Sequence, residues 1–257
     1  MIIFDAVYKW YHRGKAALPP VLGDLSFTVR EGEFICVLGP SGCGKTTLLN
    51  LIAGFIAPSE GQVLFRGKKI HGPGPDRGVV FQDATLFPWR TVWQNIAFGL
   101  EIRGVKGQLL QKTVQEHLEQ MGLADHAAKF PHTLSGGMRQ KVAIARVLAL
   151  DPQLLLMDEP FSALDANSRE RLQDEVLRLW QNQLRTVLYV THSVEEAAYL
   201  ADRILILSDT ATGLYANIDV GLARPRDRSH PTFLQLKNRL RRHLASQPCC
   251  IQPSIHR

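Results

Sequence analysis

The feature that most constrains this chain is a glycine-rich loop set between a short apolar run and a helical pattern. The loop reads Gly39-Pro-Ser-Gly-Cys-Gly-Lys-Thr-Thr47 and follows Phe34–Leu38, whose continuous apolar character predicts a buried strand. The residues from Thr47 to Ala53 are typical of a helix, which Gly54 is expected to end. Strand, glycine-rich loop and helix in this order are the context that a phosphate-binding loop requires. The sequence therefore predicts an anion site within an α/β fold.

The residue types of this loop suit the binding of nucleotide phosphates. Its glycines let backbone N–H groups turn toward phosphate oxygens, and the following helix adds the positive end of its dipole. The Lys45 ammonium can reach the β- and γ-phosphates, and the Thr46 hydroxyl can bind Mg²⁺. A chance glycine-rich turn is the alternative, which the flanking strand and helix disfavour. We predict that nucleotide phosphates contact the whole run: Gly39, Pro40, Ser41, Gly42, Cys43, Gly44, Lys45, Thr46 and Thr47.

A pair of acids ends a second apolar run. Asp158 and Glu159 directly follow Leu154-Leu-Leu-Met157, which is typical of a buried strand. Asp158 is suited to hold Mg²⁺ through a water molecule. Because neighbouring residues in a strand alternate in direction, Glu159 is expected to point elsewhere and to polarise an attacking water. The alternative is an acidic pair that only ends a strand, and the motif alone does not decide between the two.

The segment Leu134-Ser-Gly-Gly-Met-Arg-Gln140 supplies a second candidate anion site. It precedes a helix expected over Lys141–Leu150. Ser135 is a natural N-cap, and Gly136 and Gly137 leave the helix N-terminus open to an anion. An ordinary capped helix is the alternative. Two phosphate-binding helix ends are one more than a small-molecule kinase needs.

Two single polar residues complete the candidate set. His192 ends the apolar run Thr186–Thr191, a strand expected beside the one that bears Glu159, so its ring could approach a γ-phosphate. A lone histidine after a strand is nevertheless more often structural. Gln82 ends Val79-Val-Phe-Gln82, and a single glutamine is a weak signal.

Strand and helix patterns alternate along most of the chain, which predicts a largely parallel α/β sheet. Another strand is expected at Arg203–Leu207, and capping boxes are expected at Thr91 and Ser193. We predict a main domain over residues 1–210 with an inserted helical subdomain over about 88–150. A short extension over 211–257 follows, with a basic helix at Lys237–Leu244.

Composition and charge restrict the function classes. The net charge of +6 would suit a nucleic acid or an anionic membrane. The late basic clusters lack the interleaved aromatic residues that stack on bases, so we expect no nucleic-acid partner. No apolar run reaches about 18 residues, and the first ten residues do not resemble a signal peptide. The four cysteines show neither metal-ligand nor disulfide spacing, which suits a reducing cytoplasm.

Taken together, these motifs resemble the ATP-binding subunit of an ABC transporter. The glycine-rich loop resembles Walker A, Val79–Gln82 the Q-loop, Leu134–Gln140 the signature, Leu154–Pro160 Walker B, Ser162–Asp165 the D-loop, and His192 the switch histidine. They occur in the family's order over about Tyr8 to Leu207. The family fold is a P-loop NTPase core with a mostly parallel sheet, an N-terminal antiparallel β part and an inserted helical subdomain.

The resemblance implies an ATPase that acts as a head-to-tail homodimer with two ATP molecules between its chains. Glu159 would activate water, and His192 would sense the γ-phosphate. Mg²⁺ would be held by Thr46, Gln82 and, through water, Asp158. The signature residues Ser135, Gly136 and Gly137 would close over the ATP of the partner chain. Tyr11 is the aromatic residue expected to stack on adenine, with Tyr8 and Trp10 as alternatives.

Finer features resemble the nitrate, sulfonate and taurine importers, and the taurine type most. They are Gly72–Gln82 and Leu86–Arg90. The resemblance implies a peripheral subunit on the cytoplasmic face of the plasma (inner) membrane, paired with an integral-membrane permease and, indirectly, a solute-binding protein. The cargo would be a small anionic or zwitterionic solute such as taurine, an alkanesulfonate or nitrate.

In this family the region after the Q-loop docks the permease, so Phe87, Trp89 and Arg90 are interface candidates. Core packing is the alternative for the two aromatic residues. For the whole chain, the alternatives are an importer ATPase for a different small solute, a soluble ABC ATPase outside transport, and a small-molecule kinase. The sequence does not name the solute.

Overall fold

In the computed structural model, the described residues are 1–11, 19–183, 185–208 and 213–246. The chain divides into two compact units, the first made of Met1–Pro73 and Leu188–Arg257 and the second of Gly74–Val187. The boundary therefore falls within β8 (Thr186–Thr191). Among the described helices, none combines the length and apolar character that crossing a bilayer demands.

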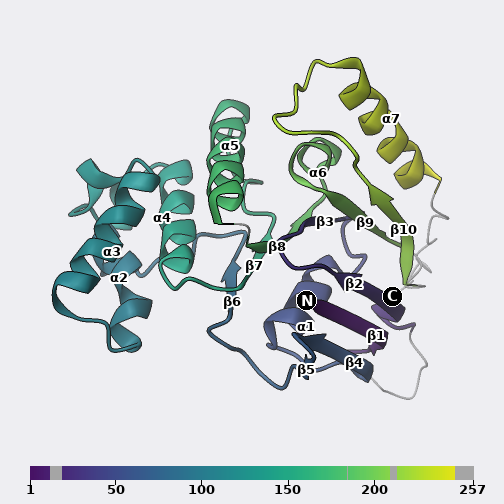
Figure 1. Ribbon diagram of the computed structural model, residues 1–257, viewed down its shortest axis with the longest axis horizontal. Coiled ribbons are helices and arrows are strands. Elements are labelled where there is room, and N and C mark those ends of the chain that lie inside the picture. The colour runs from purple at the N-terminus through teal and green to yellow at the C-terminus, as the bar shows by residue number, and fades with distance from the viewer. Residues whose placement is uncertain (12–18, 184, 209–212, 247–257) are drawn as a thin grey trace, which may run out of the picture. The chain divides into compact units, whose positions relative to one another are not determined.

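The first unit begins with an antiparallel sheet of four strands (Figure 1). Its strand order is β2-β1-β4-β5, with bounds Leu22–Val29, Ile2–Lys9, Glu60–Phe65 and Lys68–Lys69. Buried and exposed residues alternate along β2, as expected for a sheet with one face on the core. Phe4 and Phe27 stack on the buried face at a centroid distance of 4.5 Å. The expected N-terminal antiparallel part is confirmed.

The second sheet of this unit is mainly parallel. Its strand order is β10-β9-β3-β8, in which β3 (Phe34–Leu38) pairs parallel with β9 (Arg203–Leu207). Every residue of β3, β8 and β9 is buried, which explains why they read as continuous apolar runs. The edge strand β10 (Leu214–Asp219) pairs antiparallel with β9.

Among its described residues, the first unit has three helices, and two of them pack together. They are α1 (Lys45–Ala53), α6 (Val194–Leu200) and α7 (Pro231–Ala245), and α7 packs on α6 (Figure 1). The predicted helix at Lys237–Leu244 therefore begins earlier, at Pro231. His230 is its N-cap, and proline is favoured at the first helical position. Phe233 and Leu236, in its first turns, are buried.

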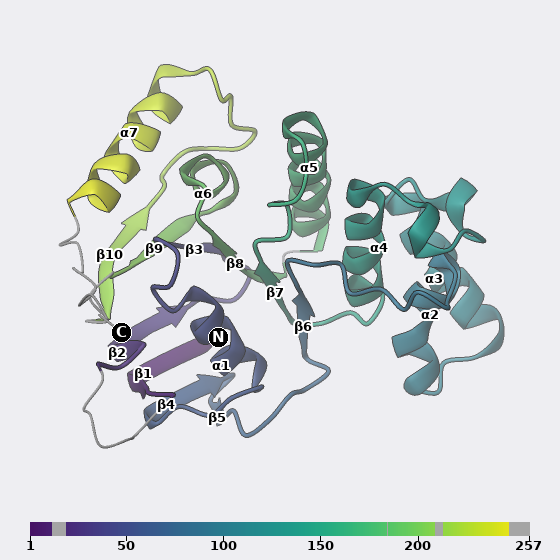
Figure 2. The same cartoon turned by 180° about the vertical axis from the view of Figure 1, so that it is seen from behind.

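The second unit contains the helices drawn in teal (Figure 2). Strands β6 (Arg77–Val80) and β7 (Leu154–Asp158) pair in parallel. The helices are α2 (Val92–Ile102), α3 (Gly107–Gln120), α4 (Gly136–Leu148) and α5 (Ala166–Gln183), with short 3-10 turns at Ala124–His126 and Pro131–Thr133. The predicted helical segment 88–150 thus lies in a unit that also holds two strands and α5.

The two predicted capping boxes have different outcomes. At Thr91 both halves form, because the Gln94 N–H donates to Thr91 Oγ1 and the Thr91 N–H donates to Gln94 Oε1. At Ser193 the serine accepts from the Glu196 N–H at 3.3 Å, but the Ser193 N–H donates to Thr191 Oγ1. The Glu196 carboxylate accepts from the Tyr189 and Thr191 hydroxyls, so only the serine half of this box is confirmed.

Gly54 ends α1 in the left-handed conformation, with φ of 81°. A Cβ at this position would lie 2.2 Å from the Gly72 carbonyl oxygen. We expect Gly54→Ala to lower the free energy of unfolding by about 3 kcal/mol, because a left-handed non-glycine residue costs about 1–2 kcal/mol and the clash adds to it. Gly67→Ala is the control, since Gly67 has φ of 76° but open space around its Cβ position. Equal losses in urea unfolding of the two variants would contradict the steric argument.

Candidate nucleotide-binding site

The phosphate-binding loop leads from β3 directly into α1. The helix begins at Lys45, two residues before the predicted start, with Gly44 as its N-cap at φ of 94°. The left-handed glycine turns the chain sharply, so Lys45 and Thr46 already lie in the first helical turn. No side chain caps this end, and its first turn contains no acid. The positive end of α1 is therefore available to an anion.

Close packing keeps this loop compact. A Cβ on Gly39 would lie 2.6 Å from Cys43 Sγ, and one on Gly44 would lie 2.6 Å from Leu22 Cδ2. The Cys43 side chain is only 6% exposed, so its thiol faces the interior rather than a ligand. The backbone of Cys43 remains the part that phosphate could contact.

Lys45 is buried against the loop, and its ammonium donates to the carbonyls of Gly39 (3.0 Å) and Pro40 (2.8 Å). Thr46 is exposed. A buried ammonium, an open helix N-terminus and an adjacent hydroxyl fit the phosphates of a nucleotide and an oxygen-coordinated Mg²⁺. The donor set thus agrees with the predicted chemistry.

Tyr11 lies beside this loop, where its hydroxyl is 3.1 Å from Thr47 Oγ1. Its ring is 54% exposed, and Lys9 Nζ lies 5.5 Å from the ring centroid. The alternatives Tyr8 and Trp10 stack on each other at 5.4 Å. An exposed ring beside the loop is what a nucleotide base would stack on, which favours Tyr11 of the three.

His192 is the last candidate of the first unit. It is exposed, directly after β8 and before the Ser193 cap of α6. The other candidates (Gln82, Ser135, Gly136, Gly137, Asp158 and Glu159) belong to the second unit. The role of His192 near a γ-phosphate stays a prediction.

The acidic pair lies at the end of β7, where Asp158 is the last strand residue. Glu159 follows in the left-handed region, with φ of 43°. The direction of the Glu159 side chain is therefore set by this turn and not by the predicted alternation of neighbouring strand residues. The turn is tied by Ser162, whose N–H and hydroxyl both donate to the Glu159 carbonyl, at 3.2 and 2.9 Å. Strained non-glycine residues concentrate at functional sites, which agrees with a catalytic carboxylate here.

The turn continues into α5 through Asp165. The Asp165 carboxylate accepts from the Ser168 N–H at 2.9 Å, as an N-cap does. This backbone donor, and after it the Ser168 side chain, lowers the pKa of Asp165. The carboxylate therefore stays ionised at the start of the helix.

The signature segment caps α4 as predicted at Ser135, whose Oγ accepts from the Met138 N–H at 3.3 Å. The helix begins at Gly136, five residues before the predicted start at Lys141, because Ser135 caps it there and both glycines adopt the first turn. Ser135 and Gly136 are exposed. This second helix end is thus open on the surface of its unit.

Gln82 lies at the start of the segment between β6 and α2, and it is exposed. Along this segment Trp89 is 72% exposed, whereas Phe87 packs on Phe98 at a centroid distance of 4.5 Å. Arg90 lies over the Phe98 ring and pairs with Glu101 at 3.1 Å. Phe87 is thus half-buried against Phe98, and its greater exposure favours Trp89 as the interface candidate.

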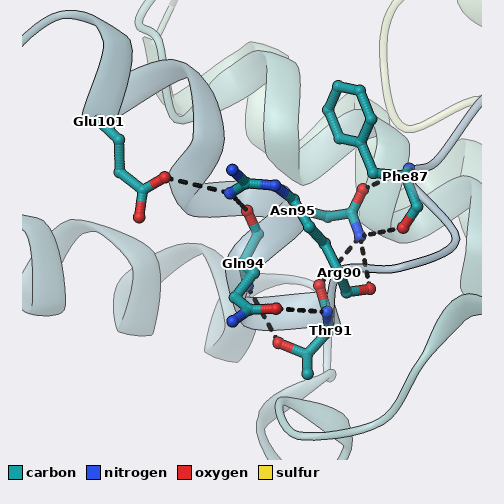
Figure 3. A network of polar contacts seen from close by, with 6 residues as sticks. All are labelled: Phe87, Arg90, Thr91, Gln94, Asn95 and Glu101. Carbon is teal, nitrogen blue, oxygen red and sulfur yellow. Dashed lines mark hydrogen bonds and ion pairs between the residues drawn. The ribbon is translucent and has the colours of Figure 1, made fainter.

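Sequence reasoning missed two residues that hold this segment, Asn95 and Arg146. Asn95 is fully buried in α2, and its amide bonds to the backbone at Phe87, Arg90 and Thr91 (Figure 3). Arg146 lies in α4 and donates to two carbonyls of the same segment. The signal in the sequence is a polar residue within the apolar stripe of each helix.

Comparisons with known proteins identify the family of this chain. The family model described as ABC transporter matches residues 22–162. The bicarbonate transport ATP-binding protein CmpD of Synechocystis is 45% identical over 247 residues, which are 92% of this chain and 86% of that protein. The taurine import ATP-binding protein TauB of Escherichia coli O157:H7 is 47% identical over 205 residues, 80% of each chain.

Solved structures support the same assignment. The dimeric structure of a post-hydrolysis state of an ATP-binding cassette, bound to ADP and Pi, aligns with a TM-score of 0.76 at 30% identity. It covers 87% of this chain and 100% of that chain. Family model, relatives and fold agree with the order of the motifs. The chain belongs to the ABC transporter family and is one of its ATP-hydrolysing cassettes, which use ATP with Mg²⁺.

Proposed function

We propose that this chain is the ATPase subunit of an importer for a small anionic or zwitterionic solute. The observation that carries the proposal is the presence of two candidate anion-binding helix N-termini in one chain, an uncapped one at Lys45 and one capped by Ser135 at Gly136. A single bound nucleotide needs only the first. The second suits the ATP of a partner chain in a head-to-tail homodimer, and the ATP-binding cassette compared above is described as dimeric.

Within the nucleotide site, each residue has a distinct task. The loop from Gly39 to Thr47 binds the phosphates through its backbone N–H groups and the Lys45 ammonium, and Tyr11 stacks on adenine. Mg²⁺, when bound, neutralises charge on the phosphates. Thr46, Gln82 and, through water, Asp158 would hold this ion. Glu159 orients and deprotonates the attacking water, and His192 contacts the γ-phosphate.

The signature residues complete the site of the partner chain. Ser135, Gly136 and Gly137 offer a hydroxyl and backbone N–H groups at the exposed start of α4. Such groups bind a γ-phosphate in the same way as the first helix end. ATP would thus join two copies, and hydrolysis would release them.

We propose a peripheral location on the cytoplasmic face of the membrane, where the subunit binds an integral permease through the surface around Trp89. A solute-binding protein would act indirectly, through the permease. Two relatives are named for bicarbonate transport and taurine import, and both solutes are small and anionic or zwitterionic. Vesicles that contain the permease, its binding protein and this subunit test the proposal. Solute-dependent ATP hydrolysis supports it, and hydrolysis indifferent to permease and solutes of this class contradicts it.

Trp89→Ala is expected to reduce co-purification with the permease about 10-fold or more, because a large exposed aromatic anchor of this kind contributes about 2 kcal/mol or more at interfaces. ATP-dependent dimer formation should be unaffected. Leu109→Ala is the matched control, since Leu109 is also exposed, at 62%, but lies on α3. Unchanged co-purification of Trp89→Ala would contradict the proposal that the permease binds the surface around Trp89.

A further inference from the structure

The segment from Phe81 to Thr91, here the 81–91 loop, is fixed along its length by side chains of two helices. Near its start, Gln140 of α4 donates to the Phe81 carbonyl at 3.3 Å. In its middle, Arg146 of α4 donates to the carbonyls of Ala84 (3.3 Å) and Thr85 (3.1 Å). Its end is held by Asn95 of α2. The loop therefore has little freedom to change shape independently of these helices.

The Arg146 guanidinium contacts three residues of this loop. Among the described residues it forms no ion pair with a carboxylate; its Nη1 and Nη2 donate to loop carbonyls, and it lies 5.5 Å from the Phe87 ring centroid. Burial lowers the pKa of Arg146. Burying a charge is unfavourable unless it is paired or hydrogen-bonded, so these bonds are what makes the arrangement possible.

One residue that Arg146 holds is strained. Thr85 has φ of 41°, a left-handed conformation that is a rare outlier for a β-branched residue. Its carbonyl is the one that Arg146 Nη1 binds. The loop thus adopts a shape that its own backbone disfavours, and the arginine stabilises that shape.

Asn95 fixes the second half of the loop (Figure 3). Its Oδ1 accepts from the Phe87 N–H at 2.9 Å, and its Nδ2 donates to the carbonyls of Phe87 (3.2 Å), Arg90 (3.0 Å) and Thr91 (2.9 Å). The side chain is 0% exposed, so these bonds form away from solvent. Trp89 lies between the pinned residues and projects outward.

We propose that Arg146 and Asn95 are positioning residues that hold the 81–91 loop in the shape that presents Trp89 to the permease. The inference rests on the proposed docking role of Trp89. Arg146 and the Ser135 cap lie on one helix, about 16 Å apart along its axis. Arg146 therefore links the docking loop to the helix that begins with the signature residues.

The test uses Arg146→Met and Asn95→Asp in the full chain. Arg146→Met removes the guanidinium but keeps most of the stem. Asn95→Asp keeps the size of the side chain but replaces the amide donor by a carboxylate oxygen, so the three donated bonds are lost and the carbonyls they held are repelled. Arg103→Met is the matched control, because Arg103 likewise donates to two backbone carbonyls of this unit, Leu150 and Pro75, outside the loop.

Two measurements are made. The first is hydrogen exchange of the peptide 81–91, which we expect to become about 10-fold faster in both variants and to stay unchanged in Arg103→Met. The second is the ratio of permease-stimulated to basal ATP hydrolysis, which we expect to fall about 10-fold. If Arg146→Met does not fold, Arg146→Lys replaces it. Adding Thr85→Asn to the Arg146 variant should partly restore slow exchange in the peptide 81–91, because asparagine tolerates the left-handed conformation.

The outcomes separate this inference from the docking proposal. Unchanged exchange in both variants overturns the positioning role. Faster exchange with an unchanged ratio of permease-stimulated to basal hydrolysis overturns the inference that this loop presents Trp89. In that case, a loss of co-purification in Trp89→Ala would still support the separate proposal that Trp89 docks the permease. Conversely, if Trp89→Ala itself has no effect, the docking proposal fails, and the inference that rests on it fails at that step.

Discussion

Glu159→Gln is expected to bind ATP with the affinity of the unmodified protein and to hydrolyse it about 10²–10³-fold more slowly. The amide keeps the size of the side chain but cannot accept a proton from water, and general-base catalysis contributes about 10²–10⁴-fold. Because ATP would no longer turn over, the ATP-bound dimer should accumulate. Steady-state phosphate release and size-exclusion chromatography with ATP measure the two effects.

A surface glutamate provides the control for this substitution. Glu116 lies on α3 and forms an exposed pair with Lys112, so Glu116→Gln should hydrolyse ATP normally. A fully active Glu159→Gln enzyme would falsify the assignment of Glu159 as the base. Slow hydrolysis without dimer accumulation would instead contradict the proposed sharing of ATP between two chains.

Lys45→Ala is expected to weaken ATP binding about 100-fold. The buried ammonium is the loop's own positive charge, and hydrogen bonds to charged groups contribute about 1.5–3 kcal/mol each. Titration with a fluorescent ATP analogue measures the affinity. Lys68→Ala is the control, since Lys68 lies exposed on β5 of the same unit. Unchanged affinity in Lys45→Ala would show that the loop does not bind the phosphates.

The strands of the fold were the most predictable elements. The bounds of β3, β8 and β9 agree with the predicted runs to the residue, because strands buried on both faces are made largely of apolar residues. Helix starts were less predictable. The first residues of α1 (Lys45-Thr46) and of α4 (Gly136-Gly137) are not apolar, so periodicity alone placed both starts too late.

The end of the chain was the least predictable part. The edge strand β10 alternates exposed and less exposed residues in the structure, but its pairing with β9 depends on a long-range backbone register that the sequence does not reveal. The predicted domain bounds, 1–210 and 211–257, stay a prediction. The structure shows that described residues after 211 add both β10 and α7 to the first unit.

In the candidate site, too, contiguous motifs were predictable from the sequence, and contacts between distant residues were not. Loop, signature and acidic pair were recognised because each is a contiguous motif whose chemistry follows from its own residues. The roles of Asn95 and Arg146 depend on bonds to backbone groups up to 62 positions away, which no local pattern encodes. The left-handed turn at Glu159 also depends on its surroundings rather than on strand alternation.

That turn has an evolutionary consequence. A glycine or an asparagine at position 159 would adopt φ of 43° at lower cost, and would make the folded chain more stable by about 1 kcal/mol. Selection for stability alone would therefore favour replacing the glutamate. Under its proposed role as the base, the Glu159 carboxylate supplies chemistry that neither replacement could, and the backbone strain is the stability cost of that role.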